Sequence, residues 1–248
     1  MAPSVRWQLA GLQVISDALA VGQPVRVLLV ERDDRAPETL ELIERARSCG
    51  ADVWLGGPGD LRRMSRDGSV ERAIAMLGAE PRADLEGLFA RGGAVWLLHR
   101  ASYPSNVGFA VRTAEVSGAD GVVVDAAFNH DDRTRVAHVS MGADRLLPVL
   151  WHATATALEV AARRGYRTIA IEDVGAQAPW EVDLTGPVVF VVGSERDGLG
   201  ADLLARCDAV VRVPMAGFVP SYNLQAAISA VAAERLRQLA SRGAHGAL

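Results

Sequence analysis

Lysine is absent from this 248-residue chain, in which all 26 basic residues are arginine. This absence excludes a phosphate-binding loop built on lysine, a lysine Schiff base of the pyridoxal or aldolase type, and a lysine general base. Cysteine is nearly absent too, since Cys49 and Cys207 are the only two and lie outside any CxxC pair. They indicate neither a zinc site nor a disulfide framework, and they favour a reducing compartment.

The signatures of several enzyme and membrane classes are also missing. The five histidines show no H-x3-H or HExxH spacing, so we expect no metal site, and there is no GxSxG nucleophile elbow. No apolar run reaches membrane-spanning length, and the opening residues, MAPSVRWQLA, lack the layout of a signal peptide. We therefore expect a soluble, cytoplasmic protein with no membrane partner.

An excess of charge of one sign is lacking as well. The 26 basic and 30 acidic residues give a net charge of −4 and a pI near 5.8. This balance excludes a strongly basic nucleic-acid coat and argues against a polybasic membrane binder. Apolar residues make up 50% of the chain, which is enough for a substantial core in one or two domains.

The first 80 residues alternate between helical and strand patterns. Leu12, Ile15 and Leu19 fall on one helical stripe, which predicts a helix over Gln8–Val21. A small α/β domain over residues 1–80 follows from this and from the remaining elements, which are Val25–Val30, Pro37–Ser48, Ala51–Leu55, Asp60–Ser65 and Val70–Leu77. The polar stretch 81–92 is predicted as a linker.

Residues 93–248 repeat the alternation with more apolar strands. The predicted strands are Ala94–His99, Gly121–Asp125, Tyr166–Ile171, Pro187–Val192 and Ala209–Val213. Helical patterns fall near Val107–Ser117, Ala153–Arg164, Leu199–Arg206 and Asn223–Leu239. Strands rich in Val and Ile between helices are typical of a parallel sheet covered on both faces, so a doubly wound α/β domain is expected.

Three polar loops that contain glycine follow strands of this second segment. The first includes Asn106-Val-Gly-Phe-Ala-Val-Arg112-Thr-Ala, and the second reads Gly193-Ser-Glu195-Arg-Asp-Gly-Leu. The third reads Val213-Pro-Met-Ala-Gly-Phe-Val-Pro-Ser-Tyr-Asn223. Ligands of α/β sheets bind at the carboxyl ends of the strands, so we expect the three loops to open on one edge.

Each loop alone has a simpler structural interpretation. Asn106 could cap the helix that follows it, with Arg112 solvated, and Glu195 could be exposed in a capping turn. Ser221 or Asn223 could cap the last helix. A helix N-terminus beside an arginine also suits a phosphate. The occurrence of all three loops on one predicted edge favours a shared site.

Taken in order, the loops resemble the three signature motifs of the SpoU (TrmH-like) branch of the SPOUT methyltransferases. The resemblance covers roughly residues 93–242, and residues 1–80 more loosely resemble the family's small substrate-binding domain. It implies a parallel α/β sheet with a C-terminal trefoil knot, S-adenosylmethionine as cofactor, and a homodimer. The implied reaction is methyl transfer to a ribose 2′-hydroxyl of ribosomal or transfer RNA.

The resemblance also implies roles for individual residues. Arg112 would act on the ribose hydroxyl, and because a guanidinium rarely deprotonates, we expect it to stabilise alkoxide charge and anchor a phosphate at least as much as to remove the proton. Asn106 and Glu195 would orient Arg112 or the ribose. Ser221 and Asn223 would line the reaction centre, and the implied cofactor contacts are Gly193, Val213, Met215, Ser221 and Tyr222.

Three features depart from expectation. Tyr222 stands where the family usually has leucine, and Arg196 replaces a small residue after the glutamate. The mild acidity of the chain is unusual for an RNA-binding protein, and an arginine patch over Arg62, Arg63 and Arg66 could supply basic character across a dimer. A non-catalytic RNA-binding relative and a methyltransferase acting on a small molecule stay open as alternatives.

Overall fold

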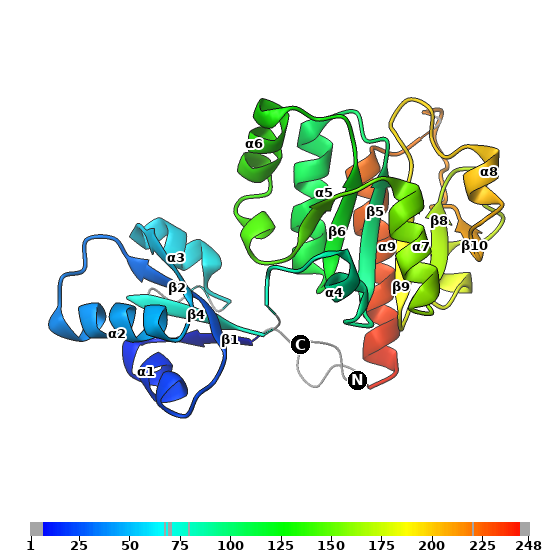
Figure 1. Cartoon of the computed structure of the whole chain (residues 1–248). Helices are drawn as coiled ribbons and strands as arrows, with labels where there is room; N and C mark the ends of the chain where they lie inside the picture. Colours follow the sequence, from blue (N-terminus) through cyan, green and yellow to red (C-terminus); the bar gives the residue numbers. More distant parts are fainter. Residues whose placement is uncertain (1–6, 67, 69–70, 79, 220, 244–248) are drawn as a thin grey trace. The chain divides into compact units, whose positions relative to one another are not determined.

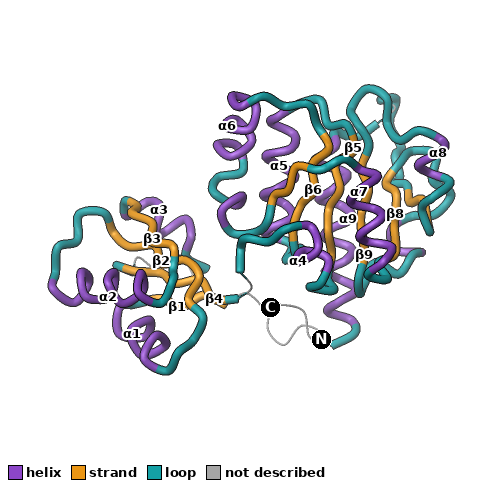
Figure 2. The backbone as a smooth tube through the Cα atoms, viewed as in Figure 1, coloured by secondary structure: helices purple, strands orange, loops and turns teal. Residues whose placement is uncertain are grey.

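The computed structural model describes residues 7–66, 68, 71–78, 80–219 and 221–243. The chain divides into two compact units, Ala2–Pro81 and Arg82–Leu248 (Figures 1 and 2). Among the described residues no helix is long and apolar enough to span a membrane. The same residues contain no group of three or more His, Cys, Asp or Glu side chains placed to hold a metal ion.

The first unit is a four-stranded mixed sheet with three helices. Its elements are β1 (Trp7–Ala10), α1 (Leu12–Ala20), β2 (Val25–Glu31), α2 (Pro37–Ser48), β3 (Asp52–Gly56), α3 (Pro58–Met64) and β4 (Ala73–Leu77). The strand order is β1-β4-β2-β3; only β2 and β3 run parallel. Ile15, Leu28, Val30 and Ala75 are fully buried between the sheet and α1 and α2.

The helix predicted over Gln8–Val21 is wrong in its first third. Residues 8–10 belong to β1, which pairs antiparallel with β4, and the helix begins only at Leu12. Gly11, with φ of +92°, turns the chain between the two elements, a backbone conformation that glycine adopts without strain. Val70, the first residue of the last predicted element, lies outside the described residues.

Residues 81–92, expected to be a linker, contain a short helix that packs on the second unit. This helix, α4 (Leu85–Phe89), begins at Asp84, whose carboxylate accepts a hydrogen bond from the Gly87 N–H at 2.7 Å. Leu88 and Phe89 are buried in the core of the second unit. The polar composition of the stretch concealed these apolar anchors.

The second unit is built on a six-stranded, wholly parallel sheet. The strands are β5 (Ala94–His99), β6 (Gly121–Asp125), β7 (Val149–Trp151), β8 (Arg167–Ile171), β9 (Val188–Val192) and β10 (Ala209–Val211), in the order β10-β8-β9-β5-β6-β7. The longer helices are α5 (Pro104–Val116), α6 (His130–Val139), α7 (Thr154–Arg163) and α9 (Leu224–Ser241); α8 (Ala201–Leu204) and the 3₁₀ turns η1 (Ala143–Arg145) and η2 (Pro179–Glu181) complete it. The parallel α/β sheet expected from the sequence is confirmed.

Helices cover both faces of this sheet (Figure 1). Side chains of α5, α6 and α9 pack on one face, where Trp96 and Phe190 stack with ring centroids 4.7 Å apart. Side chains of α4 and α7 pack on the other face. Because both faces are buried, the strands read as unbroken apolar runs, whereas α6 buries only Val136 and was not recognised in the sequence.

Candidate active site

The three predicted loops meet at the carboxyl edge of the six-stranded sheet. The Asn106 side-chain amide donates to Oε1 of Glu195 at 2.7 Å, and the Ser102 backbone N–H donates to Oε2 of the same carboxylate at 3.1 Å. Nδ2 of Asn223 donates to Oδ1 of Asn106 at 3.4 Å. One residue from each loop is therefore joined in a single polar cluster, Asn106–Glu195–Asn223, across 117 residues of sequence.

Asn106 reaches this cluster because it is not the N-cap of its helix. The interpretation of Asn106 as a cap is wrong: α5 begins at Pro104 with Tyr103 as N-cap, since proline fits the first helical position, where no N–H is needed. Asn106 lies inside the first turn, and its side chain is free to face Glu195. Because Asn106 lies inside the first turn, its side chain does not cap the helix and instead takes part in the polar cluster.

Helix α5 is held closely on two sides. A Cβ built on Gly108 would lie 2.6 Å from Cβ of Val139 and 2.9 Å from the Val136 carbonyl oxygen, so only glycine permits the contact between α5 and α6. On the other side, the Thr113 hydroxyl lies 3.5 Å from the Ser229 hydroxyl of α9. These contacts fix the rotation of α5 and with it the direction of Asn106.

The loop after β9 is a tight backbone turn. A Cβ on Gly193 would lie 2.7 Å from the Leu199 backbone nitrogen, and Gly198 has φ of +61°. Oε2 of Glu172 accepts the Leu199 N–H at 2.8 Å and so holds the end of the turn. Glu172 follows β8 directly; sequence reasoning missed it, although a carboxylate at the carboxyl end of a buried strand is a visible signal.

The third loop leads into α9. Asn223 is the N-cap of this helix, as the simpler interpretation allowed, because its Oδ1 accepts the Gln225 N–H at 2.9 Å while its Nδ2 reaches Asn106. The Tyr222 hydroxyl donates to the Pro214 carbonyl oxygen at 3.2 Å and closes the loop. Of the predicted cofactor contacts, Gly193 is buried and Val213 half-buried, whereas Met215, Ser221 and Tyr222 are exposed.

Arg112 is not brought to this cluster within one chain. Its side chain is exposed, and in the described part of the chain no hydrogen bond or ion pair joins it to Asn106, Glu195 or Asn223. Arg112 follows Asn106 by six residues, which at 100° per residue places it roughly 240° around the helix. The structure therefore joins three of the five predicted catalytic residues and leaves Arg112 and Ser221 apart.

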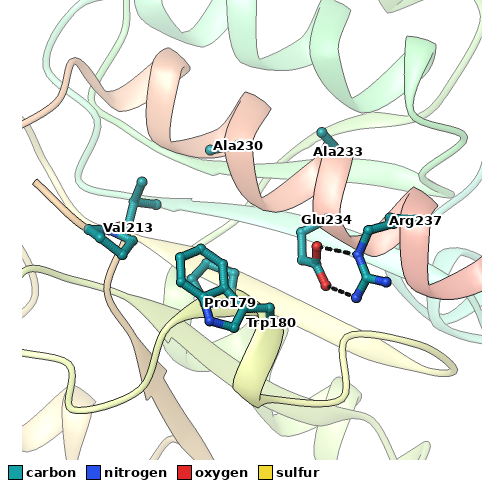
Figure 3. Close-up of a pocket in the computed structure, with 8 residues that line it drawn as sticks. Pro179, Trp180, Val213, Ala230, Ala233, Glu234 and Arg237 are labelled. Atoms are coloured by element: carbon teal, nitrogen blue, oxygen red, sulfur yellow. Dashed lines mark hydrogen bonds and ion pairs between the residues drawn. The ribbon is translucent and has the colours of Figure 1, made fainter.

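A hollow of about 330 Å³ lies beside the third loop (Figure 3). It is bordered by η2, the third loop and the outer side of α9, and its lining residues are Pro179, Trp180, Val213, Pro214, Ala230, Ala233, Glu234 and Arg237. The Glu234 carboxylate and the Arg237 guanidinium form a bidentate pair at 2.7 and 2.8 Å at one end. Val213 is the one predicted site residue among these lining residues; Asn106, Glu195 and Asn223 are not among them.

A second polar network lies along the same sheet edge. Oδ2 of Asp125, at the end of β6, accepts both the backbone N–H and the hydroxyl of Thr154, at 3.0 and 2.8 Å. Nδ1 of His99, at the end of β5, lies 2.7 Å from the Thr154 hydroxyl oxygen, which can accept a hydrogen bond from a protonated Nδ1 because the hydroxyl itself donates to Asp125. Burial lowers the pKa of His99 although Asp125 raises it, so the imidazole is neutral at neutral pH.

The chain has recognisable relatives among known protein families and curated proteins. The model of the SpoU rRNA Methylase family matches residues 94–233. A 23S rRNA (guanosine-2′-O-)-methyltransferase, RlmB, from Xanthomonas campestris pv. campestris is 30% identical over 96% of this chain and 98% of its own length. An uncharacterised tRNA/rRNA methyltransferase of Mycobacterium avium is 31% identical over 92% of this chain and 76% of its own length.

Solved structures of similar fold are also described as SpoU methyltransferases. The SpoU methyltransferase AviRb from Streptomyces viridochromogenes matches with a TM-score of 0.62 at 24% identity, over 97% of this chain and 92% of its own. Its complex with the cofactor AdoMet matches with a TM-score of 0.58 at 25% identity, over 95% and 91% of the two chains. These similarities support the parallel α/β architecture of the second unit.

Proposed function

Since this chain belongs to the SpoU rRNA methylase family, we propose that it transfers a methyl group from S-adenosylmethionine to a ribose 2′-hydroxyl of ribosomal or transfer RNA. The observation that carries this proposal is the Asn106–Glu195–Asn223 cluster, in which three loops distant in sequence converge on one edge. The relative named for guanosine 2′-O-methylation and the AdoMet complex of AviRb support the reaction and the cofactor.

The residues present fit the cofactor. A Cβ on Gly193 would overlap Gly198 and the Leu199 nitrogen, so the tight turn after β9 requires glycine there, and the Tyr222 hydroxyl closes the third loop, whose Asn223 joins the same cluster. Gly193, Val213, Met215, Ser221 and Tyr222 would hold the cofactor there. When bound, S-adenosylmethionine supplies an electrophilic methyl group on a sulfonium sulfur.

The polar cluster positions the other reactant. The Glu195 carboxylate fixes the Asn106 amide, which leaves Asn106 one further N–H, and Asn223 is fixed by its bond to the start of α9. Such groups hold a ribose hydroxyl in line for displacement, where correct placement supplies much of the rate. Arg112 stabilises the negative charge that develops on the oxygen as its proton leaves, and anchors the adjacent phosphate.

A homodimer would bring Arg112 into this site. Arg112 is exposed and lies far around α5 from Asn106. Trp180, which lines the hollow of Figure 3, is exposed, and so are Phe218 and Val219 of the third loop. A monomer rarely exposes such a cluster without a partner. The second copy would cover this apolar surface and place its own Arg112 at the ribose, and Ser221 would line the same junction.

Mixed dimers test this arrangement. Arg112→Ala and Glu195→Ala chains are each inactive alone, but a heterodimer of the two has one complete site if the arginine comes from the partner. Purified heterodimers should then recover about half of the wild-type rate. If both groups act within one chain, the heterodimer stays inactive and the cross-subunit assignment is wrong.

Incorporation of tritiated methyl groups into bulk RNA tests the reaction itself. The wild-type protein should label ribose 2′-oxygens, Arg112→Ala should not, and Arg206→Ala, an exposed arginine near the opposite sheet edge, serves as the matched control. Binding of S-adenosylmethionine without RNA labelling would identify a non-catalytic relative or an enzyme for a small molecule. Mapping of ribose methylation with and without the protein then identifies the nucleotide.

We extend the proposal to the fold and the setting of the protein. Gly175 lies so close to the β10 region that its Cβ would be 2.7 Å from the Val211 carbonyl carbon, and Arg212 N–H donates to the Gln177 carbonyl oxygen at 2.8 Å. This contact brings the segment after β8 against the end of β10; the C-terminal trefoil knot is proposed from the family resemblance, and tracing the chain in a crystal structure tests it. The first unit acts as the RNA substrate-binding domain, and the protein works in the cytoplasm.

A further inference from the structure

An aromatic ring and an arginine face each other beside the polar cluster. The guanidinium carbon of Arg196 lies 5.9 Å from the ring centroid of Tyr103, a distance typical of a cation–π contact. Tyr103 is 44% exposed, and Arg196 is exposed as well. Tyr103 immediately precedes α5 and Arg196 follows Glu195, so this pair flanks the Asn106–Glu195 hydrogen bond.

A second pair of this kind lies further along the same sheet edge. The guanidinium carbon of Arg133, on α6, lies 4.5 Å from the ring centroid of Trp151, the last residue of β7. Phe128, in the loop after β6, lies against the same indole with ring centroids 5.9 Å apart. Arg133 is exposed, and both rings are half-exposed.

The strand order places these pairs in one row. The consecutive neighbours β9, β5, β6 and β7 each contribute at their carboxyl ends, and strands about 4.8 Å apart make this row roughly 15 Å long. Arg100, directly after β5, is exposed in the row and has φ of +52°, a strained conformation for a residue with a side chain. Such strain concentrates at functional sites.

The charges along the row leave its arginines available. Among the described residues no ion pair involves Arg100, Arg133 or Arg196. Two nearby carboxylates are occupied, because Asp125 accepts from Thr154 and Asp132 accepts from the Asn129 N–H at 3.2 Å. Asp131 and Asp197 are exposed, and together with the Glu195 carboxylate beside Arg196 they reduce the positive potential locally, although no ion pair joins them to these guanidinium groups in the described residues.

We propose that this row binds the single-stranded RNA that flanks the target nucleotide. The row, named here the edge track, consists of Arg100, Tyr103, Phe128, Arg133, Trp151 and Arg196. Unpaired bases would stack on its rings, and its arginines would contact phosphates, which is how proteins hold single strands. The proposal rests on the proposed function and deepens it, since a local row of cations lets a chain of net charge −4 bind RNA.

The test uses the full chain and a labelled single-stranded oligoribonucleotide of about ten nucleotides, within the usual length of such sites. The triple variant Arg100→Gly, Arg133→Ala, Arg196→Ala removes the cations, and glycine at position 100 keeps the positive φ without strain. Its affinity, measured by fluorescence anisotropy, should fall about tenfold or more at low salt. The slope of log K against log salt should fall by about 0.7 per lost phosphate contact.

Controls separate the edge track from the proposed function. Arg206→Ala should keep wild-type RNA affinity, and the triple variant should keep wild-type affinity for S-adenosylmethionine by calorimetry. Weaker RNA binding in the triple variant supports the track even if the wild type never methylates RNA, an outcome that would refute the proposed function alone. Unchanged affinity and slope, in a protein that does methylate RNA, would overturn the track alone.

Three further measurements keep the test decisive. If the triple variant is unstable by circular dichroism, Arg133→Gln and Arg196→Gln as single changes replace it, and each should lower the salt slope. A duplex of the same sequence should bind more weakly than the single strand and lose less affinity on substitution; equal losses would contradict recognition of unpaired bases. Conversion of a dimer into a monomer by the triple variant would identify the edge as a subunit contact and overturn the proposal.

Discussion

The two edges of the six-stranded sheet use polar side chains differently. At the amino edge, side chains serve the backbone: Asp120 accepts the Gly93 N–H at 2.7 Å, and the Tyr166 hydroxyl accepts the Gly92 N–H at 2.9 Å. At the carboxyl edge some side chains also hold the backbone, as Glu172 holds the Leu199 N–H, but side chains from separate loops bind one another in addition, as Asn106 and Glu195 do, and arginines stay exposed. The amino edge is therefore built for stability, and the carboxyl edge for binding.

The largest expected effect is on activity at the carboxyl edge. Glu195→Ala removes the acceptor of the Asn106 amide and of the Ser102 N–H, so methyl transfer should fall by about 100-fold or more, together with a loss of about 1–2 kcal/mol of unfolding free energy from the two hydrogen bonds. The matched change at the amino edge is Asp208→Ala, which removes the acceptor of the Thr168 N–H at 2.7 Å. Asp208→Ala should cost about 1 kcal/mol of unfolding free energy and leave the rate constant of methyl transfer unchanged. A large loss of rate in Asp208→Ala and none in Glu195→Ala would contradict the comparison.

Two glycines sharpen the same contrast. In Gly193→Ala the new Cβ meets backbone at the Leu199 nitrogen, so affinity for S-adenosylmethionine, measured by calorimetry, should fall about tenfold or more. In Gly93→Ala the Cβ meets the Asp120 carboxyl group, and urea denaturation should reveal a loss of about 1–3 kcal/mol. Cofactor affinity should survive the second change. A loss of cofactor affinity in both variants would mean that the edges are coupled.

A smaller effect is expected at Arg235 of α9. This residue is 8% exposed, its Nε has no hydrogen-bond partner among the described residues, and burial lowers its pKa although Asp120 raises it. Arg235→Met keeps the stem and removes the buried charge, so the unfolding free energy should stay the same or rise by about 1 kcal/mol. A decrease of about 2 kcal/mol in urea denaturation would show that the guanidinium has a stabilising partner.

The smallest effect concerns pH dependence at His99. Burial lowers the pKa of this histidine in the folded state, so between that value and the usual value near 6.5 the unfolded chain binds more protons. Stability from this group is complete above the usual pKa and is lost as pH falls through the folded value. The stability advantage of wild type over His99→Gln should therefore shrink from about pH 8 to about pH 5. An advantage that grows on acidification would contradict the lowered pKa.

Sequence patterning predicted most strands of the second unit because the burial of each strand is visible in its own residues. Both faces of the sheet are covered, so each strand reads as an apolar run, and the polar loops after β5, β9 and β10 stand out against it. From this, the meeting of Asn106, Glu195 and Asn223 could be predicted. Their functional roles stay predictions.

The rest depended on contacts distant in sequence. Strand β1 looked helical because its apolar residues continue the stripe of α1, and only pairing with β4 makes it a strand. Glu172 and the His99–Asp125–Thr154 network join groups that are unremarkable until the strand order is known. Where Arg112 points is set by the rotation of α5, which packing against α6 and α9 decides.

Helix α5 is packed tightly between α6 and α9, so residues on it are constrained, whereas exposed residues beside the site are free to vary. A residue larger than glycine at position 108 would push α6 away, so the rotation of α5 about its axis is fixed. The direction of the Asn106 side chain is therefore determined by the packing of the hydrophobic core. The flanking side chains of Tyr103 and Arg196 are exposed and carry no such packing constraint. New RNA targets can therefore be acquired by altering those flanks, with the methyl-transfer geometry carried over intact.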